Sequence, residues 1–133
     1  MQYSYILIPS LVSQSRSMKA VVGELLWFLE GSMDERRLAE ITFEDSRENL
    51  IDRKTIWTAN ADKQGKELGY TNTALVKLLG PVYGVQWRTF GDYGFGVDQV
   101  REVISQIKEN PDSRRIILSA WNPAAFPIVT GKQ

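Results

Sequence analysis

The chain has 133 residues, in which sixteen basic side chains balance sixteen acidic ones, and it contains neither cysteine nor histidine. The charge balance argues against general nucleic-acid binding, which needs clustered positive charge. The two missing residue types exclude disulfides, thiolate or imidazole metal sites, and Ser-His-Asp or Cys-His catalysis within these residues. No carboxylate spacing suggests an oxygen cage, so we expect no bound metal.

The length suits a single domain, and the hydrophobic fraction of 43% is ample for a packed core. No apolar stretch reaches the ~20 residues that a membrane helix requires. A short apolar run at residues 5–8 has no basic segment ahead of it and is broken by Pro9, which makes a poor signal peptide. We therefore expect a cytoplasmic protein with no membrane contact.

The first part of the chain contains a strong helical pattern. Residues 3–7 alternate weakly and predict a short strand, and the serine-rich residues 9–17 predict a loop. Residues 18–30 predict a helix that stops at Gly31. The aliphatic residues of this stretch recur at helical spacing: Val21, Val22, Leu25, Leu26 and Leu29.

A second, weaker helical signal follows. Ser32 and Glu35 fit the S-x-x-E capping box, which predicts a helix through about Ile41. Residues 42–54 are charged and predict a loop that could include a helical turn, and residues 55–60 are a possible start of another helix.

Glycine marks the middle of the chain. Residues 63–73 contain Gly65, Gly69 and Asn72 and predict a surface insertion. Residues 80–88 predict a turn that leads into an aromatic segment, and residues 91–96 predict a glycine-rich turn.

The last clear elements are a helix and a strand. Residues 97–109 place Val97, Val100, Ile104 and Ile107 on one face with charges opposite, which predicts an amphipathic helix. Asn110-Pro111 ends it, because the residue before proline avoids helical geometry. Residues 114–121 (RRIILSAW) predict a buried strand. Helices before and between strand candidates indicate an α+β or α/β class.

Three segments resemble the thymidylate synthase family: GELLWFLEG at residues 23–31, LGPVYGVQWR at residues 79–88, and residues 97–123, which contain VDQV and NPDSRRIILSAWNP. Their order and spacing also agree with the family. The resemblance covers about residues 21–125 and implies a partial synthase fold, with helices packed on a truncated sheet.

The resemblance also implies a division of the chain. Residues 1–17 do not match the arginine loop that precedes the family's helix, and residues 126–133 do not match its cysteine-bearing P-C-H segment. We expect a divergent N-terminal segment at 1–17, a partial synthase-like domain at 18–125 and a divergent tail at 126–133. On this interpretation the chain is an N-terminal-to-middle fragment without the catalytic-cysteine half.

The family resemblance implies reductive methylation of dUMP to dTMP, with 5,10-methylene-tetrahydrofolate as one-carbon donor and reductant. That chemistry needs a thiolate that adds to C6 of the pyrimidine, and serine or threonine hydroxyls are far less acidic. With no cysteine in these residues, we expect the chain to be inactive alone. Other interpretations are a non-catalytic partner of a full-length synthase, a decayed product without function and, less favoured, a pyrimidine hydroxymethylase, which needs the same thiol.

Two side chains are catalytic candidates by this resemblance. Glu24 matches the helix glutamate that organises water and relays protons, and a carboxyl among Leu25, Trp27 and Phe28 is suited to proton transfer. Tyr83, between glycines in GPVYG, would assist removal of the C5 proton. The alternatives are a solvated glutamate on a helix edge and a half-buried tyrosine in a turn.

The remaining candidates bind ligands by the same resemblance. Ile56 and Trp57 match the segment that packs against the folate, and Asn60 stands where many relatives have tryptophan. Arg114 and Arg115 would reach the nucleotide phosphate in the partner subunit of a homodimer, since guanidinium groups bind phosphate in bidentate fashion. The alternatives are a core tryptophan and a solvated charge pair. We interpret five other family-like residues as fold-supporting first: Gln86, Trp87, Asp98, Trp121 and Asn122.

Overall fold

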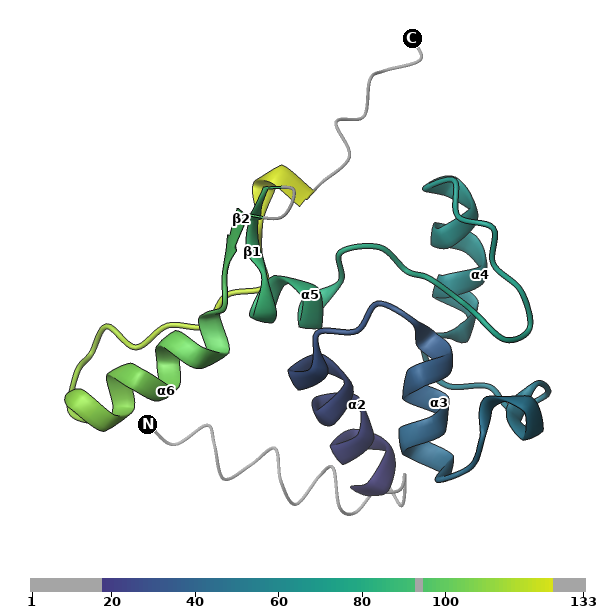
Figure 1. Ribbon diagram of the computed structural model, residues 1–133, viewed down its shortest axis with the longest axis horizontal. Helices are drawn as coiled ribbons and strands as arrows, with labels where there is room; N and C mark the ends of the chain where they lie inside the picture. The colour runs from purple at the N-terminus through teal and green to yellow at the C-terminus, as the bar shows by residue number, and fades with distance from the viewer. Residues whose placement is uncertain (1–17, 93–94, 126–133) are drawn as a thin grey trace, which may run out of the picture.

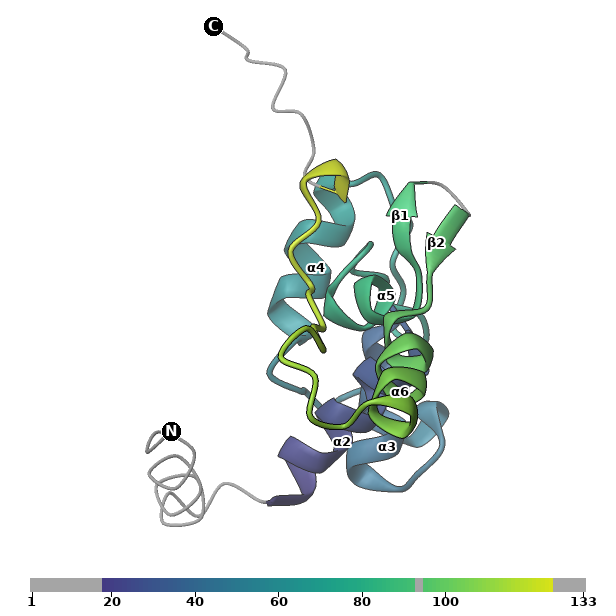
Figure 2. The same ribbon diagram turned by 90° about the vertical axis from the view of Figure 1, so that its left-hand side faces the viewer.

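A computed structural model describes residues 18–92 and 95–125, so the strand predicted at 3–7 and the loop at 9–17 lie outside the described residues. Figures 1 and 2 show the helices α2, α3 and α4 in one part of the molecule, α5 at its centre, and α6 with a small hairpin beyond α5. The elements in chain order are α2 (Met18–Glu30), α3 (Glu35–Phe43), the 3-10 turn η1 (Arg47–Leu50), α4 (Thr58–Glu67), α5 (Tyr83–Arg88), β1 (Phe90–Asp92), β2 (Phe95–Val97), α6 (Gln99–Glu109) and the 3-10 turn η2 (Pro123–Ala125).

The first two helices meet at a tight corner. The predicted helix at 18–30 is confirmed, and Gly31 ends it with a left-handed φ of 71°, a conformation that glycine adopts at little cost. The capping box is wrong: Asp34, not Ser32, is the N-cap of α3, and its carboxylate accepts from the backbone N–H of Arg36 at 3.1 Å. Ser32 instead accepts a hydrogen bond from the backbone N–H of Asp34. Glu35 cannot complete the predicted capping box because its side chain is buried in the core.

The core lies between α2, α3, α4 and the segment that enters α5. Its centre is Trp27, which is fully buried and donates its indole N–H to the carbonyl of Asp34 at 3.0 Å. Burying one leucine-sized side chain stabilises a fold by about 1.5–3 kcal/mol, so even a small core of this kind can hold three helices together. The cluster consists of Trp27, Leu38, Ala61 and Leu79, with Phe28, Ile41, Trp57 and Val82 packed against it.

A buried ion pair ties the loop after α3 to this core. Glu35 and Arg36 are both fully buried, and two hydrogen bonds of 2.7 Å join them. Arg36 also donates to the carbonyls of Leu50 and Arg53, while Glu35 accepts from two threonine hydroxyls, of Thr55 and Thr58. Burial raises the pKa of Glu35, but the hydrogen bonds from Arg36 and the threonines outweigh it, so the net pKa is lowered.

The middle of the chain is more helical than its sequence predicts. The helical turn allowed within residues 42–54 is present as η1, and α4 continues from the start at 55–60 into the segment predicted to be a surface insertion. Gly65 is buried within α4, because the side chain of Asn72 and the carbonyl of Leu78 occupy the space that a Cβ would take. The aromatic segment that follows Gly80 forms the short helix α5.

The described sheet is a two-stranded antiparallel hairpin. β1 and β2 pair with Phe90 opposite Val97, so the hairpin includes the segment at 91–96 that was predicted as a glycine-rich turn and one residue on either side. The predicted amphipathic helix is confirmed as α6, which has Asp98 as N-cap and ends at Glu109 with Asn110 as C-cap. The molecule therefore combines helices with a small antiparallel sheet, which is the predicted α+β class.

The predicted buried strand at 114–121 is wrong. This segment forms no strand, and the side chain of Ile117 is 71% exposed. The physical reason is that a strand needs a hydrogen-bonded neighbour, and the described residues give this segment none.

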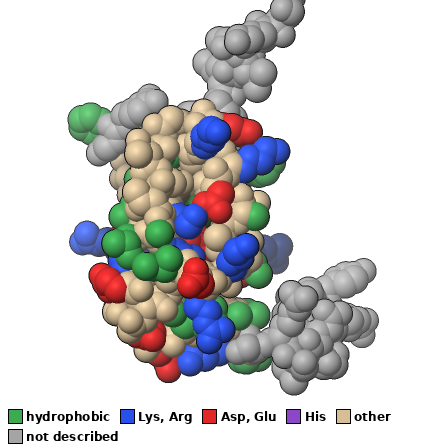
Figure 3. Space-filling view, turned by 90° about the vertical axis from the view of Figure 1, so that its right-hand side faces the viewer, with side chains coloured by type: hydrophobic (Ala, Val, Ile, Leu, Met, Phe, Trp, Pro, Cys, Tyr) green, Lys and Arg blue, Asp and Glu red, His purple; other side chains and the backbone are tan. Residues whose placement is uncertain are grey.

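Charges of both signs alternate over the face seen in Figure 3, which looks onto the α3 and α4 side of the described residues. Several charges of the described residues are paired: Arg47 bridges Asp34 and Glu40, and Lys77 pairs with Asp62. None of the described helices is both long and apolar enough to cross a membrane.

Candidate active site

Three of the predicted site residues meet although they come from distant parts of the sequence. Glu24 lies on α2, Trp57 immediately precedes α4, and Tyr83 opens α5. The indole N–H of Trp57 donates to the Glu24 carboxylate at 2.8 Å, and the rings of Trp57 and Tyr83 lie 5.9 Å apart. A carboxylate, an indole and a phenol are thus held beside one another.

Phe28 fixes the orientation of these rings. Its ring meets Tyr83 at 5.6 Å and Trp57 at 6.2 Å, both nearly edge to face, and it also contacts Trp87 at 5.5 Å. Such aromatic pairs contribute about 0.5–1.5 kcal/mol each beyond the area that they bury. Since Phe28 is one turn of α2 from Glu24, the same helix positions both the carboxylate and the aromatic cluster.

Gly84 allows α5 to approach α2 closely enough for this arrangement. A Cβ at Gly84 would lie 2.7 Å from the carbonyl oxygen and 2.8 Å from the Cα of Phe28, both of them backbone atoms that cannot rotate away. A side chain here would push α5 off α2 and carry Tyr83 with it. The second glycine of GPVYG is therefore explained by helix packing.

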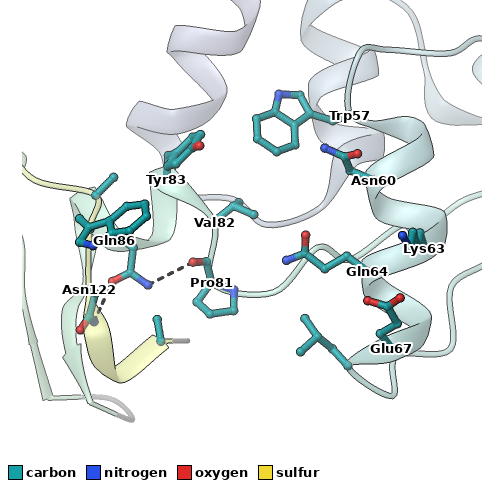
Figure 4. Close-up of a pocket in the computed structure, with 14 residues that line it drawn as sticks. Trp57, Asn60, Lys63, Gln64, Glu67, Pro81, Val82, Tyr83, Gln86 and Asn122 are labelled. Atoms are coloured by element: carbon teal, nitrogen blue, oxygen red, sulfur yellow. Dashed lines mark hydrogen bonds between the residues drawn. The ribbon is translucent and has the colours of Figure 1, made fainter. Parts of the chain in front are cut away.

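A groove of about 720 Å³ opens in front of Trp57 and Tyr83 (Figure 4). This volume lies within the ~300–1,000 Å³ that ligand sites usually occupy. One side is α4, and the other is formed by the entry to α5 and by residues near the end of the described chain. The groove is lined by Trp57, Asn60, Lys63, Gln64, Glu67, Leu68, Pro81, Val82, Tyr83, Gln86, Ala120, Trp121, Asn122 and Ala125.

Comparison with known proteins identifies the family of the chain. Residues 1–130 match the thymidylate synthase family. The chain belongs to the thymidylate synthase family. The thymidylate synthase of Enterobacteria phage T4 is 45% identical over 116 residues, which cover 87% of this chain and 36% of the phage protein. The human thymidylate synthase is 40% identical over 131 residues, which cover 91% of this chain and 38% of the human protein.

The fold agrees with the same family. A crystal structure of the T4 phage thymidylate synthase superimposes with a TM-score of 0.66 at 46% identity, over 83% of this chain and 34% of the phage chain. The chain thus spans well under half the length of the synthases that it matches.

The groove includes residues that the sequence did not single out. Lys63, Gln64 and Glu67 follow Asn60 along α4 at helical spacing, and Figure 4 shows Gln64 and Glu67 on the side of α4 that faces Pro81 and Val82. The spacing was visible in the sequence, but it carries this meaning only once the segment is known to be a helix.

Amide side chains close the far side of the groove. Asn122 donates to the Gln86 side chain at 2.9 Å and to the Gly91 carbonyl at 3.2 Å, and Gln86 donates to the carbonyl of Pro81. Gln99 joins the same network by donating to the backbone carbonyls of Gln86 and Ser119. These contacts agree with the fold-supporting interpretation of Gln86 and Asn122 and also place both residues at the groove.

Four of the predicted site residues do not line the groove: Glu24, which is held behind Trp57 by a hydrogen bond, and Ile56, Arg114 and Arg115. Ile56 is 67% exposed and is not among the residues that line the groove. Arg114 and Arg115 are exposed in the segment that follows α6, where neither guanidinium forms an ion pair or hydrogen bond with the described residues. Neither arginine is among the residues that line the groove with Tyr83.

Proposed function

We propose that this chain contributes the Glu24–Trp57–Tyr83 side of a thymidylate synthase active site, in which dUMP is reductively methylated to dTMP. The observation that carries the proposal is the 2.8 Å hydrogen bond from Trp57 to Glu24, beside Tyr83 at the mouth of a ligand-sized groove. Membership of the synthase family supports the reaction class.

Each of the three side chains has a distinct task. Glu24, fixed by Trp57 through one carboxylate oxygen, retains a second oxygen that can hold water and relay protons to and from the pyrimidine. Tyr83 is 48% exposed with its ring anchored on Phe28, so its phenol can reach a base in the groove and assist removal of the C5 proton. Trp57 offers an indole face for a flat ring and excludes water from it.

The groove suits 5,10-methylene-tetrahydrofolate in size and in its aromatic lining. When bound, this cofactor supplies the one-carbon unit and the hydride. We assign Trp57 to stacking and Asn60, which lines the groove beside it, to hydrogen bonding with the cofactor through its amide. Ile56, exposed next to Trp57, would extend the apolar surface just outside the groove.

The thiolate that the reaction requires is not among these residues, which contain no cysteine. Loss of a covalent nucleophile costs on the order of 10⁶-fold in rate in a related case, so the 133 residues alone are expected to be inactive. The nucleophile would come from the part of the synthase fold that this chain does not match. Arg114 and Arg115 would bind the nucleotide phosphate across a homodimer interface in the cytoplasm.

A chimera tests the proposal. Residues 1–125 of this chain are joined to the part of the T4 phage synthase that this chain does not match, and dihydrofolate release from dUMP and the folate is followed by absorbance. We expect an active chimera in which Glu24→Gln lowers kcat about 10²–10⁴-fold, the usual range for general acid–base groups. Glu30→Gln is the matched control on α2, since Glu30 is exposed and pairs with Arg37. Equal activity of the two variants would exclude a catalytic role for Glu24.

The alternative function is a non-catalytic partner of a full-length synthase. The exposed aliphatic side chains along α2 favour an association of some kind. Co-purification of the tagged chain with intact T4 phage synthase tests it, and failure to associate at micromolar concentration would contradict it. A chain without cooperative urea unfolding would instead indicate a decayed product and contradict both functions.

A further inference from the structure

A buried carboxylate holds the turn that precedes α4. Glu35 is fully buried, and its Oε1 accepts a hydrogen bond of 2.6 Å from the hydroxyl of Thr55 and another of 2.6 Å from the hydroxyl of Thr58. Trp57 lies between these two threonines and is the N-cap of α4. One buried charge thus anchors the chain on both sides of Trp57.

This carboxylate also determines what the two hydroxyls can do. An ionised carboxylate only accepts hydrogen bonds, so each hydroxyl gives its single proton to Glu35 and keeps its oxygen as an acceptor. The Thr55 oxygen accepts from the backbone N–H of Trp57 at 3.2 Å, and the Thr58 oxygen accepts from the backbone N–H of Thr55 at 2.9 Å. The backbone of Trp57 is therefore connected to the buried charge through the side chain of Thr55.

The connection matters because ring packing alone does not fix the indole N–H of Trp57. Its ring lies between 5.8 and 6.2 Å from the rings of Trp27, Phe28 and Tyr83. Aromatic pairs are favourable over centroid distances of about 4.5–7 Å, so these contacts tolerate small displacements. The hydrogen bond of 2.8 Å from the indole to Glu24 does not, since hydrogen bonds weaken steeply as their geometry departs from linear.

We propose that Thr55 is a positioning residue for the reaction: its hydroxyl, directed by Glu35, fixes the backbone of Trp57 so that the indole holds Glu24 and presents its face to the cofactor. The inference rests on the proposed function, which gives Glu24 and Trp57 their tasks. Thr55 is not among the residues that line the groove, so it acts through Trp57 and not on a ligand.

Three substitutions isolate the contribution of this hydroxyl. Thr55→Val removes it and keeps the branched shape of the side chain, whereas Thr55→Ser retains it. Thr73→Val is the matched control, because it removes a hydroxyl that accepts from the backbone N–H groups of Leu75 and Val76, in the segment that follows α4.

The first measurement is the exchange of the indole N–H groups with water, followed by NMR on the ¹⁵N-labelled 133-residue chain. We expect Thr55→Val to speed exchange at Trp57 at least ~3-fold, an effect of the size expected for one hydrogen bond. Exchange at Trp27, whose indole is fully buried and donates to the Asp34 carbonyl, should stay unchanged. Thr55→Ser and Thr73→Val should leave both rates at the wild-type value.

Two results of this measurement would overturn the inference. One is unchanged exchange at Trp57 in Thr55→Val, which would mean that the hydroxyl does not position the indole. The other is equal acceleration at Trp27 and Trp57, which would mean that the substitution lowers the stability of the whole core.

The second measurement is the steady-state kinetics of the chimera. We expect Thr55→Val to raise the KM for 5,10-methylene-tetrahydrofolate about 3–10-fold, and Thr55→Ser to restore the wild-type value. A purely structural loss would reduce the amount of active enzyme and leave KM unchanged, and that pattern in an active chimera would overturn the inference. An inactive wild-type chimera, with exchange at Trp57 responding as expected, would overturn the proposed function alone and leave Thr55 as the residue that positions Trp57.

Discussion

Replacing Arg36 with methionine tests whether the buried ion pair holds the loop that positions Trp57. Arg36 makes four hydrogen bonds, two of 2.7 Å to Glu35, one of 2.9 Å to the Leu50 carbonyl and one of 3.1 Å to the Arg53 carbonyl. Methionine fills similar space with a flexible apolar chain, so the cavity contribution is small. The main loss is electrostatic, because a fully buried carboxylate is left without its counterion.

The size of that loss can be bounded from both sides. Breaking a buried pair by removing one partner costs about 3–5 kcal/mol. Glu35 can limit the cost by taking up a proton, which at pH 7 requires about 3.5 kcal/mol for an ordinary glutamate, at 1.36 kcal/mol per pKa unit. We therefore expect Arg36→Met to lower the free energy of unfolding by about 3–4 kcal/mol at pH 7. The loss should shrink toward pH 5, where protonation becomes easier.

Urea unfolding, followed by tryptophan fluorescence, measures this change, and the neighbouring residue supplies the control. Arg37 pairs with Glu30 at 2.7 Å, but both side chains are more than 40% exposed, so Arg37→Met should cost no more than about 1 kcal/mol. Adding Glu35→Gln to Arg36→Met should restore part of the stability, since it removes the unpaired charge. Equal costs for Arg36→Met and Arg37→Met, or a cost independent of pH, would refute the reasoning.

Three further outcomes follow from the same contacts. Gly84→Ala should destabilise the chain by about 1–3 kcal/mol in urea, because the added Cβ meets the backbone of α2. Gly23→Ala should be close to neutral, since it meets a side-chain hydroxyl and gains helix propensity, and a similar loss for both variants would contradict this account. Asn122→Ala removes the amide that donates to the Gln86 side chain and to the Gly91 carbonyl, and it should lower the free energy of unfolding by about 1–3 kcal/mol in urea. An unchanged free energy of unfolding would show that water replaces the amide. Because the pKa of Glu35 is lowered in the folded state, its ionisation contributes stability that is complete above the unfolded-state pKa near 4.5. That stability is lost as the pH falls through the lower folded-state pKa. Urea midpoints that stay constant from pH 6 to pH 3 would argue against this contribution.

The elements that the sequence predicted well are those whose apolar residues repeat at helical spacing. α2 and α6 both have such a repeat, and for both helices the predicted first and last residues are close to those in the structure. α4 has none, because it buries Thr58, Ala61 and Gly65 rather than large aliphatic side chains. Close backbone packing, not periodicity, stabilises that helix.

The errors at the strand and at the cap have a different origin. An apolar run at 114–121 satisfies the local pattern of a buried strand, but a strand also depends on neighbours that the local sequence does not contain. Ser32 and Glu35 fit a capping box, yet the tertiary contacts of Glu35 with Thr55 and Thr58 outweigh the local motif. In both cases long-range partners decided the outcome.

The site could be assembled from the family resemblance but not from the spacing of its residues. Glu24 and Trp57 are hydrogen-bonded across 33 positions, and nothing in the intervening sequence indicates that contact. Lys63, Gln64 and Glu67 on α4 were missed because they fell in a segment predicted to be an insertion.

The distribution of packing explains how this part of a synthase can hold site geometry without the rest. The core around Trp27 and the Glu35–Arg36 pair both lie among α2, α3 and the start of α4, directly behind Glu24 and Trp57. The helix α6, whose Ile104 and Ile107 are each 49% exposed, lies on the other side of α5 (Figure 1). Because stability varies from place to place within a structure, the carboxylate and aromatic side chains can be set by contacts within this chain.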